Sequence, residues 1–371
     1  MAEPAGFVPP PYPYDRLDRL APLAAALDGG VVDLSIGTPC DPPIDSVIAA
    51  LSTSNSERGY PPSIGTDSLR QAIRSWLDRR FDLDVPLAQL AACVGSKEFV
   101  ATTPQYLHLR TPSKDTVLYP AVAYPTYAMG ATLAGLRGVP VASRADGALD
   151  ISSIGAADAK RALMLWVNSP ANPTGALTDL GEAAAWGRAH GVPVFSDECY
   201  VEFTWDGPAS TILHHGLDGV IAVHSLSKRS NLAGLRVGFY AGDAELVGYL
   251  KEVRKHVGML VPGPAQAAAA VALGDDAHVA VQRDRYQHRL ERLGKVFSAW
   301  SGVEVPLPAG GFYLWFDAGD GWEFTERLAR QGGALVSPGD FYGSGGEQNV
   351  RAAVVQPDDR IELVARRLGV L

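Results

Sequence analysis

Short apolar runs alternate with helical patterns through the middle of the chain, and this alternation limits the possible folds more than any other feature. The runs are rich in β-branched residues and lie at 116–119, 139–142, 161–167, 192–195, 220–223 and 237–240. Helical periodicity fills most of the gaps, as at 179–189. This rhythm predicts an α/β fold in which helices cover both faces of a largely parallel sheet.

The 371 residues exceed what one core usually holds, and the pattern changes after residue 240. A long charged helix at 278–300 is followed by short strands at 311–316, 334–336 and 350–354, which predicts a second lobe of α+β type. We expect an arm with part of a small domain at 1–30, a large domain at 31–255 and a small domain at 256–371. The arginines of the charged helix are expected to form a solvated face: Arg283, Arg285, Arg289 and Arg292.

Bulk properties exclude several classes of protein. The net charge of −9 and the pI near 5.4 argue against nucleic acid or an anionic membrane as partner. No apolar run is long enough to span a membrane, and the N-terminus lacks a signal-peptide pattern. Cys40, Cys93 and Cys199 form neither a disulfide framework nor a metal-binding C-x-x-C motif. We therefore expect a cytoplasmic protein without a metal site.

A lysine at the end of the 220–223 run is the first candidate for chemistry. Lys228 lies between two hydroxyls and an arginine, namely Ser225, Ser227 and Arg236. A lysine amine can form a Schiff base with a carbonyl-bearing cofactor, while hydroxyls and a guanidinium bind its phosphate. The same spacing also suits a solvated loop, so the motif alone leaves both interpretations open.

Polar residues follow other runs at the same predicted edge of the sheet. Asn172 lies in the turn-forming stretch 168–175, and Asp197 follows the 192–195 run. A buried carboxylate is costly unless a cation pairs with it, and a protonated pyridine nitrogen is such a cation. Gly95 and Ser96 precede a helix whose free N–H groups can bind phosphate. Each feature taken singly can also be a tight turn or a helix cap.

The motifs N-S-P-A-N-P-T-G, D-E-C-Y, S-L-S-K and R-V-G-F occur in this order at 168–175, 197–200, 225–228 and 236–239. Over essentially the whole chain the set resembles the class I/II aminotransferases, which are pyridoxal-phosphate enzymes of fold type I. The resemblance implies a mostly parallel seven-stranded sheet and bound pyridoxal 5′-phosphate. It implies that Lys228 bonds to the cofactor and carries a proton during the reaction. Asp197 would pair with the ring nitrogen, and this contact would lower the pKa of Asp197.

The resemblance assigns further residues around the cofactor. Asn172 and Tyr200 would hydrogen-bond its phenolic oxygen, and Tyr124 would stack on its ring. The phosphate would be bound by Gly95, Ser96, Lys97, Ser225 and Arg236, with Tyr60 supplied by the other subunit of a homodimer. Arg351, Gly37 and Asn172 would bind an amino-acid or 2-oxo-acid substrate. Taken singly, Tyr124 also suits a core position and Arg351 a surface ion pair.

Four longer stretches, at 33–43, 165–175, 223–239 and 337–343, resemble the actinobacterial-type N-succinyldiaminopimelate aminotransferases. The resemblance implies amino-group exchange between glutamate and N-succinyl-2-amino-6-oxopimelate in lysine and diaminopimelate biosynthesis. Residues 259–263 lack the arginine that aspartate aminotransferases use for a distal carboxylate. Lys97, Arg229 and Lys255 are unranked candidates for that task.

Other functions would retain the same motifs. An aspartate-, alanine-, methionine- or aromatic-type aminotransferase, or a C–S lyase, would keep the cofactor residues. Product analysis separates these functions, because transfer gives a keto acid and a new amino acid whereas elimination gives pyruvate and ammonia. A regulatory or binding module on a degenerate fold is a further alternative. Regulators of this type carry an extra DNA-binding domain, which the roughly 30 residues of the arm are too short to form.

Overall fold

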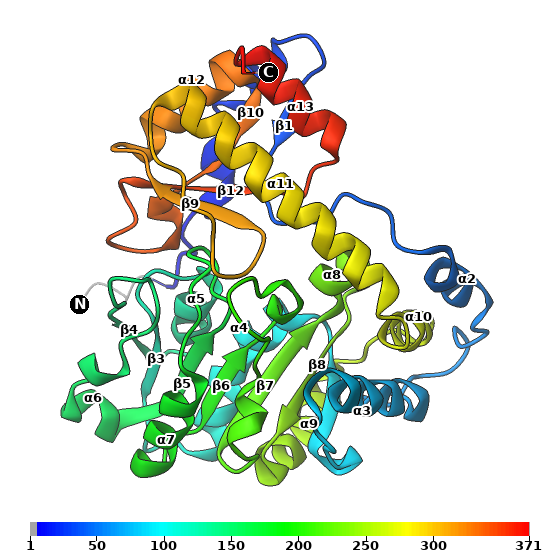
Figure 1. Cartoon of the computed structure of the whole chain (residues 1–371). Helices are drawn as coiled ribbons and strands as arrows, with labels where there is room; N and C mark the ends of the chain where they lie inside the picture. The colour runs from blue at the N-terminus through cyan, green and yellow to red at the C-terminus, as the bar shows by residue number, and fades with distance from the viewer. Residues whose placement is uncertain (1–5, 371) are drawn as a thin grey trace.

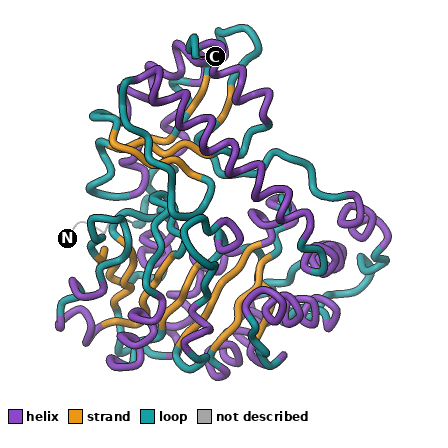
Figure 2. The backbone as a smooth tube through the Cα atoms, in the orientation of Figure 1, coloured by secondary structure: helices purple, strands orange, loops and turns teal. Residues whose placement is uncertain are grey.

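The computed structural model describes residues 6–370, which form two lobes joined by a long helix, α11 (Ala277–Ser301) (Figure 1). The first lobe contains a twisted sheet with helices on either side (Figure 2). Within the described residues this sheet has seven strands in the order β2-β8-β7-β6-β5-β3-β4. The strands are β2 (Leu90–Cys93), β3 (Thr116–Pro120), β4 (Arg137–Val141), β5 (Ala162–Asn168), β6 (Val194–Asp197), β7 (Val220–Ser225) and β8 (Gly238–Gly242).

Strand direction brings many loops to one edge of this sheet. β4, β3, β5, β6 and β7 pair in parallel, whereas β8 is antiparallel to both β7 and β2. The carboxyl ends of β2, β3, β5, β6 and β7 therefore meet the amino end of β8. The predicted fold class is confirmed, including the largely parallel sheet. β2 was not predicted as a strand, because its sequence, Leu-Ala-Ala-Cys, has no β-branched residue.

Helices cover both faces of the sheet and exclude water from it. One face packs against α2 (Asp45–Thr53), α3 (Asp67–Phe81), α7 (Leu180–His190) and α10 (Gly263–Leu273). The other face packs against α4 (Ser96–Arg110), α5 (Thr126–Leu133) and α9 (Ala244–Val257). The short helices α6 (Ala156–Arg161) and α8 (Leu226–Arg229) lie in connections. Because both faces are buried, the strands are almost continuously apolar.

The second lobe has its own apolar core, built mainly from the C-terminal third of the chain. Its antiparallel sheet has the order β11-β12-β9, and a small parallel pair joins β1 to β10. The strands are β1 (Val32–Asp33), β9 (Tyr313–Asp317), β10 (Ala334–Leu335), β11 (Ser337–Pro338) and β12 (Asn349–Ala353). The helices are α1 (Ala21–Ala25), α11, α12 (Gly321–Gly332) and α13 (Asp358–Arg367).

The domain boundaries at residues 30 and 255 stay predictions, and two segments lie across them. Val32 and Leu34 are fully buried in the core of the second lobe, although they follow residue 30. α10 follows residue 255, yet its alanines pack in the core beside the large sheet. Part of the predicted arm, residues 1–5, lies outside the described residues. Within residues 6–370, no helix has the length and apolarity needed to cross a membrane.

The predicted solvated arginine face on α11 is wrong at Arg289 and Arg283. The Arg289 side chain is buried and pairs with Asp41 at 2.6 Å and Asp358 at 2.6 Å. Arg283 donates to the backbone oxygen of Glu202 at 2.6 Å. A run of arginines along one face of a helix predicts a solvent-exposed face only where no other segment packs on it. In this structure the loop carrying Asp41 and the start of α13 pack on the arginine face of α11.

We predict that Arg289→Met costs roughly 3–5 kcal/mol of unfolding free energy, because it leaves Asp41 with its main partner removed in a buried position. Urea-induced unfolding followed by circular dichroism would measure this loss. The matched control is Arg330→Met, which breaks the exposed pair with Glu326 and should cost less than about 1 kcal/mol. Equal losses in the two variants would contradict the prediction.

Candidate functional site

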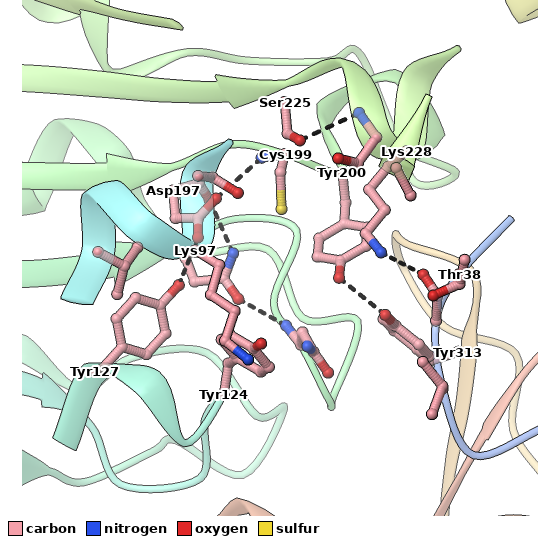
Figure 3. Close-up of a pocket in the computed structure, with 18 of the residues that line it drawn as sticks. Thr38, Lys97, Tyr124, Tyr127, Asp197, Cys199, Tyr200, Ser225, Lys228 and Tyr313 are labelled. Atoms are coloured by element: carbon pink, nitrogen blue, oxygen red, sulfur yellow. Dashed lines mark hydrogen bonds between the residues drawn. The ribbon is translucent and has the colours of Figure 1, made fainter. Parts of the chain in front are cut away.

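A cavity of about 420 Å³ lies where the strand ends of the large sheet converge (Figure 3). Of the predicted site residues, all except Gly95 and Tyr60 line it. They are Gly37, Ser96, Lys97, Tyr124, Asn172, Asp197, Tyr200, Ser225, Lys228, Arg236 and Arg351. These residues come from both lobes, since Gly37 and Arg351 belong to segments beside the second core. The fold thus gathers residues that are more than three hundred positions apart in the sequence, as Gly37 and Arg351 are.

Lys228 projects into the cavity from α8, the turn that follows β7. Ser225 begins this turn, because its Oγ accepts a hydrogen bond from the N–H of Ser227 at 3.2 Å. The Lys228 ammonium donates to the backbone oxygen of Gly37. Desolvation, together with the positive charges of Arg351 and Arg236, lowers the pKa of Lys228 to about 8, against the opposing effect of Cys199. A lysine with such a pKa is a far better nucleophile at neutral pH than an ordinary one.

Asp197 closes β6 and is 5% exposed. It accepts hydrogen bonds from Tyr127 Oη at 2.9 Å and from the N–H of Cys199 at 3.3 Å, both visible in Figure 3. Within residues 6–370 it forms no salt bridge, and burial raises its pKa. The lowered pKa expected from the sequence depends on a cation from outside the chain. The carboxylate is therefore placed to attract a positively charged group.

Arg351 lies on β12 and is 1% exposed, so it is not a surface residue. Its Nη1 donates to Asn172 Oδ1 at 2.9 Å, and its guanidinium carbon lies 4.1 Å from the centre of the Tyr313 ring. No carboxylate pairs with it among the described residues. The surface ion pair considered for Arg351 is thus wrong. A buried, unpaired guanidinium beside a cavity is suited to binding a carboxylate ligand.

The opposite end of the cavity can accept a phosphate. Ser96 and Lys97 begin α4, so backbone N–H groups at the positive end of the helix face the cavity. Gly95 precedes them with φ of 80°, and a Cβ there would lie 2.3 Å from Nη2 of Arg236. Glycine is therefore required for the approach of the guanidinium. Gly95 does not line the cavity but permits this arrangement.

Sequence reasoning missed four aromatic residues of the cavity wall: Tyr12, Tyr14, Tyr127 and Tyr313. Tyr127 lies in the first turn of α5, and its N–H donates to the backbone oxygen of Tyr124 at 3.2 Å, so the turn before the helix keeps the two residues close together. The Tyr313 hydroxyl lies 2.8 Å from the Tyr200 hydroxyl. Tyr12 and Tyr14 belong to the N-terminal arm, where no periodic pattern indicated a role. Their proximity to the cavity follows from the tertiary fold alone.

Asn168, which the motif contained but which received no role, holds the Asn172 loop against β6. Its Oδ1 accepts from the N–H of Asn172 at 2.7 Å, and its Nδ2 donates to the backbone oxygen of Asp197 at 2.8 Å. One buried amide thus fixes two neighbouring strand ends. This contact explains why the turn carries an asparagine at its first position.

The remaining candidates are placed differently. Lys97 Nζ lies 3.1 Å from Tyr12 Oη at the cavity wall. Tyr60 is 98% exposed and outside the cavity. Arg229 is buried behind α8, where it pairs with Glu202 at 3.0 Å. Lys255 lies exposed near the end of α9 and does not line the cavity. The proposal of Arg229 or Lys255 for a distal carboxylate in this chain's own cavity is therefore wrong.

The sequence profile of the family "Aminotransferase class I and II" matches residues 29–368. The chain belongs to this family. Its members depend on pyridoxal phosphate, so the chain is a pyridoxal-phosphate-dependent aminotransferase. The buried Asp197, which forms no salt bridge with the described residues, and the phosphate cradle beside Arg236 fit that cofactor.

Individual relatives cover nearly the whole chain. The 4-dedimethylamino-4-oxo-anhydrotetracycline transaminase OxyQ of Streptomyces rimosus is 42% identical over 97% of this chain and 99% of its own. A "Probable aminotransferase" of Mycobacterium tuberculosis is 40% identical over 97% of this chain and 85% of its own. The solved structure of a "probable N-succinyldiaminopimelate aminotransferase" from Thermus thermophilus is 30% identical, with a TM-score of 0.86 over 96% of this chain and 100% of its own.

We predict that Lys228 of the cofactor-free chain titrates near pH 8. Its pKa is lowered, so the neutral, reactive amine is the main form above about pH 8, and reactivity is lost as the pH falls below it. Labelling with an amine-selective reagent across a pH series, mapped by peptide mass spectrometry, measures this midpoint. Exposed lysines in the same digest serve as the internal reference. A midpoint near the ordinary lysine value of about 10.4 would contradict the prediction.

Proposed function

We propose that this aminotransferase exchanges an amino group between N-succinyl-LL-2,6-diaminopimelate and 2-oxoglutarate, which yields N-succinyl-2-amino-6-oxopimelate and glutamate. The charge of the cavity supports this proposal most strongly. Among the described residues, four cationic side chains and one carboxylate line it: Lys97, Lys228, Arg236, Arg351 and Asp197. Arg236 would pair with the phosphate, Arg351 with the α-carboxylate, and Lys228 would bond to the cofactor, which leaves Lys97 without an assigned anion. A second acidic group on the substrate would pair with Lys97, in line with a role in lysine and diaminopimelate biosynthesis.

Pyridoxal phosphate, when bound, supplies an electron sink that makes the substrate Cα–H acidic. Lys228 would bind the carbonyl carbon of the cofactor and, once released, carry a proton on Nζ. Asp197 would keep the ring nitrogen protonated, with Tyr127 and the N–H of Cys199 holding the carboxylate in place. Tyr124 would lie against the ring.

The other residues of the cavity would orient the reactants. Asn172 and Tyr200 would bind the phenolic oxygen. The start of α4 (Gly95, Ser96), together with Ser225 and Arg236, would bind the phosphate. Arg351 would bind the substrate α-carboxylate with its two parallel N–H groups, beside the backbone of Gly37. The guanidinium of Arg351 packs over the ring of Tyr313, which would hold it in place.

Lys97 is our proposed receptor for the distal acidic group. Its ammonium lies over the Tyr12 ring, 4.8 Å from the centre, and 5.9 Å from the centre of the Tyr124 ring. Among residues 6–370 it pairs with no carboxylate. The resemblance assigned Lys97 to the phosphate, but its ammonium contacts the Tyr12 hydroxyl and lies against the rings of Tyr12 and Tyr124, which supports the distal role.

We further propose that the working unit is a homodimer. Tyr60 is 98% exposed, an unusual position for a large aromatic side chain. Ile48 on α2 and Val271 on α10, two helices that pack against each other, are also exposed apolar residues. A second copy of the chain would cover these residues and bring Tyr60 to the phosphate of its neighbour.

A second candidate is amination of a larger ketone. The relative named as a transaminase of 4-dedimethylamino-4-oxo-anhydrotetracycline has the higher identity of the two sequence relatives described above. The tyrosines at the cavity wall would suit a ring system. The other open alternatives are an alanine-, methionine- or aspartate-type aminotransferase.

The decisive experiment is a half-reaction with the cofactor-loaded protein, followed by the absorbance of the bound cofactor. We expect rapid loss of the original band with N-succinyl-LL-2,6-diaminopimelate and glutamate, and little change with alanine, methionine or aspartate. A fast response to alanine or methionine alone would replace the proposed substrate with a general amino acid. Release of pyruvate and ammonia would indicate elimination instead.

We predict that Lys97→Met lowers the half-reaction kcat/KM for glutamate by about tenfold to a hundredfold, the effect of losing a charge-assisted hydrogen bond. Alanine, which has no second carboxylate, should react at the wild-type rate, however slow, and cofactor affinity should be unchanged. Stopped-flow absorbance measures both rates. If both substrates lose rate equally and the cofactor binds more weakly, Lys97 binds the phosphate.

A further inference from the structure

Arg229 directly follows Lys228, but its side chain extends away from the cavity. It is 4% exposed, and its hydrogen bonds lead to several different elements. Nε donates to Glu202 at 3.0 Å, Nη1 donates to the backbone oxygen of Ala272 at 2.7 Å, and Nη2 donates to Asp276 at 3.0 Å. Arginine is suited to this place because its planar fork can satisfy several acceptors at once.

Glu202 connects this arginine to the turn that carries Tyr200. Glu202 lies in the short helix η4 (Val201–Phe203), which begins directly after Tyr200, and it is 7% exposed. Its carboxylate also accepts from Trp76 Nε1 at 3.0 Å and from Arg80 Nε at 2.8 Å. The ion pair therefore joins the lysine turn to a second turn at the cavity.

The other contacts of Arg229 reach the junction of α10 and α11. The oxygen of Ala272 lies at the carboxyl end of α10, the negative end of the helix dipole, where a cation is stabilising. Asp276 precedes α11, and His278 on α11 lies 2.9 Å from the hydroxyl of Ser230. Figure 1 shows α11 passing from this junction to the second lobe.

Polar contacts along α11 lead back to the lysine itself. Gln282 accepts from Asn231 at 3.3 Å and donates to Asp41 at 2.8 Å. Asp41 lies a few residues after Gly37, whose backbone oxygen accepts from Lys228. The lysine is thus held from two sides, by its own turn through Arg229 and by the 37–41 loop through α11.

From this closed set of contacts we infer that Arg229 is a positioning residue that sets the location of the Lys228 amine through the backbone of α8. The inference rests on the proposed role of Lys228 but not on the identity of the substrate. Among the described residues, the hydrogen bonds of Arg229 all lead away from the cavity, and Glu202 and Asp276 balance its charge. Arg229 therefore affects Lys228 by fixing the position of its amine, and not through the electrostatic field of the guanidinium.

The surroundings of Lys228 give the direction of the expected change. The ionisable groups facing it are Cys199, Arg351, Arg236 and Asp197. Burial is the largest cause of its lowered pKa. α8 has only four residues and cannot hold its geometry alone. Without Arg229 the turn would loosen, water would reach the amine, and the proton affinity of Lys228 would rise.

The test is a pH titration of Lys228 in the cofactor-free chain, by amine-selective labelling mapped with peptide mass spectrometry, which reports the proton on Lys228 Nζ. Arg229→Met removes the charge and the bridging bonds, whereas Arg229→Lys keeps a charge for Glu202. Arg80→Met is the matched control, because it removes a partner of the same Glu202 carboxylate without touching α8. Thermal unfolding is recorded for each variant.

We expect the midpoint to rise by about one pH unit in Arg229→Met, to rise less in Arg229→Lys and to stay at the wild-type value in Arg80→Met. An unchanged midpoint in Arg229→Met with lowered thermal stability would reduce Arg229 to a structural residue and overturn the inference. Equal shifts in Arg229→Met and Arg80→Met would also overturn it, since the charge of Glu202 would then be the cause. If Arg229→Met does not fold, Arg229→Lys decides by the same criteria.

Discussion

The site depends on a buried carboxylate that the chain does not neutralise. Asp197 ends a central strand, receives hydrogen bonds from Tyr127 and the backbone of Cys199, and forms no salt bridge with any of residues 6–370. A charge in such a place is unfavourable until a positive group arrives. A cofactor with a protonated ring nitrogen removes this penalty and gains orientation at the same time. The parallel strands on either side make the position possible, because their buried faces exclude water from the carboxylate.

Positive charge dominates the rest of the cavity, although the protein as a whole is acidic. Arg351 and Lys97 each lie against tyrosine rings of the cavity wall, and neither pairs with a carboxylate of the described chain. Such unpaired cations favour anionic ligands by direct attraction. Buried cations further from the cavity are paired instead, as Arg289 is with Asp41 and Arg229 with Glu202. The buried cations outside the cavity are therefore paired and structural, whereas Arg351 and Lys97 are available to bind ligands.

Much of this arrangement is readable from the sequence, because the relevant residues follow short apolar runs. Asp197 ends a strand, Lys228 and Asn172 lie in the turns that follow two neighbouring strands, and parallel strands bring such residues to one edge. The strand order, the contact of Tyr200 with Tyr313 and the place of Tyr12 depend on pairing between distant segments, which local patterns do not encode. The burial of Arg289 was missed for a similar reason. The sequence pattern of a charged helix face is the same whether that face contacts water or the acidic residues of another segment.

The bond between Lys228 and the cofactor is the central claim, and borohydride reduction tests it most directly. Reduction of the cofactor-loaded protein makes that bond permanent, and peptide mass spectrometry then locates the added mass. The structure predicts one cofactor per chain on the peptide that contains Lys228. A label on Lys97, or on no lysine of the cavity, would contradict the account.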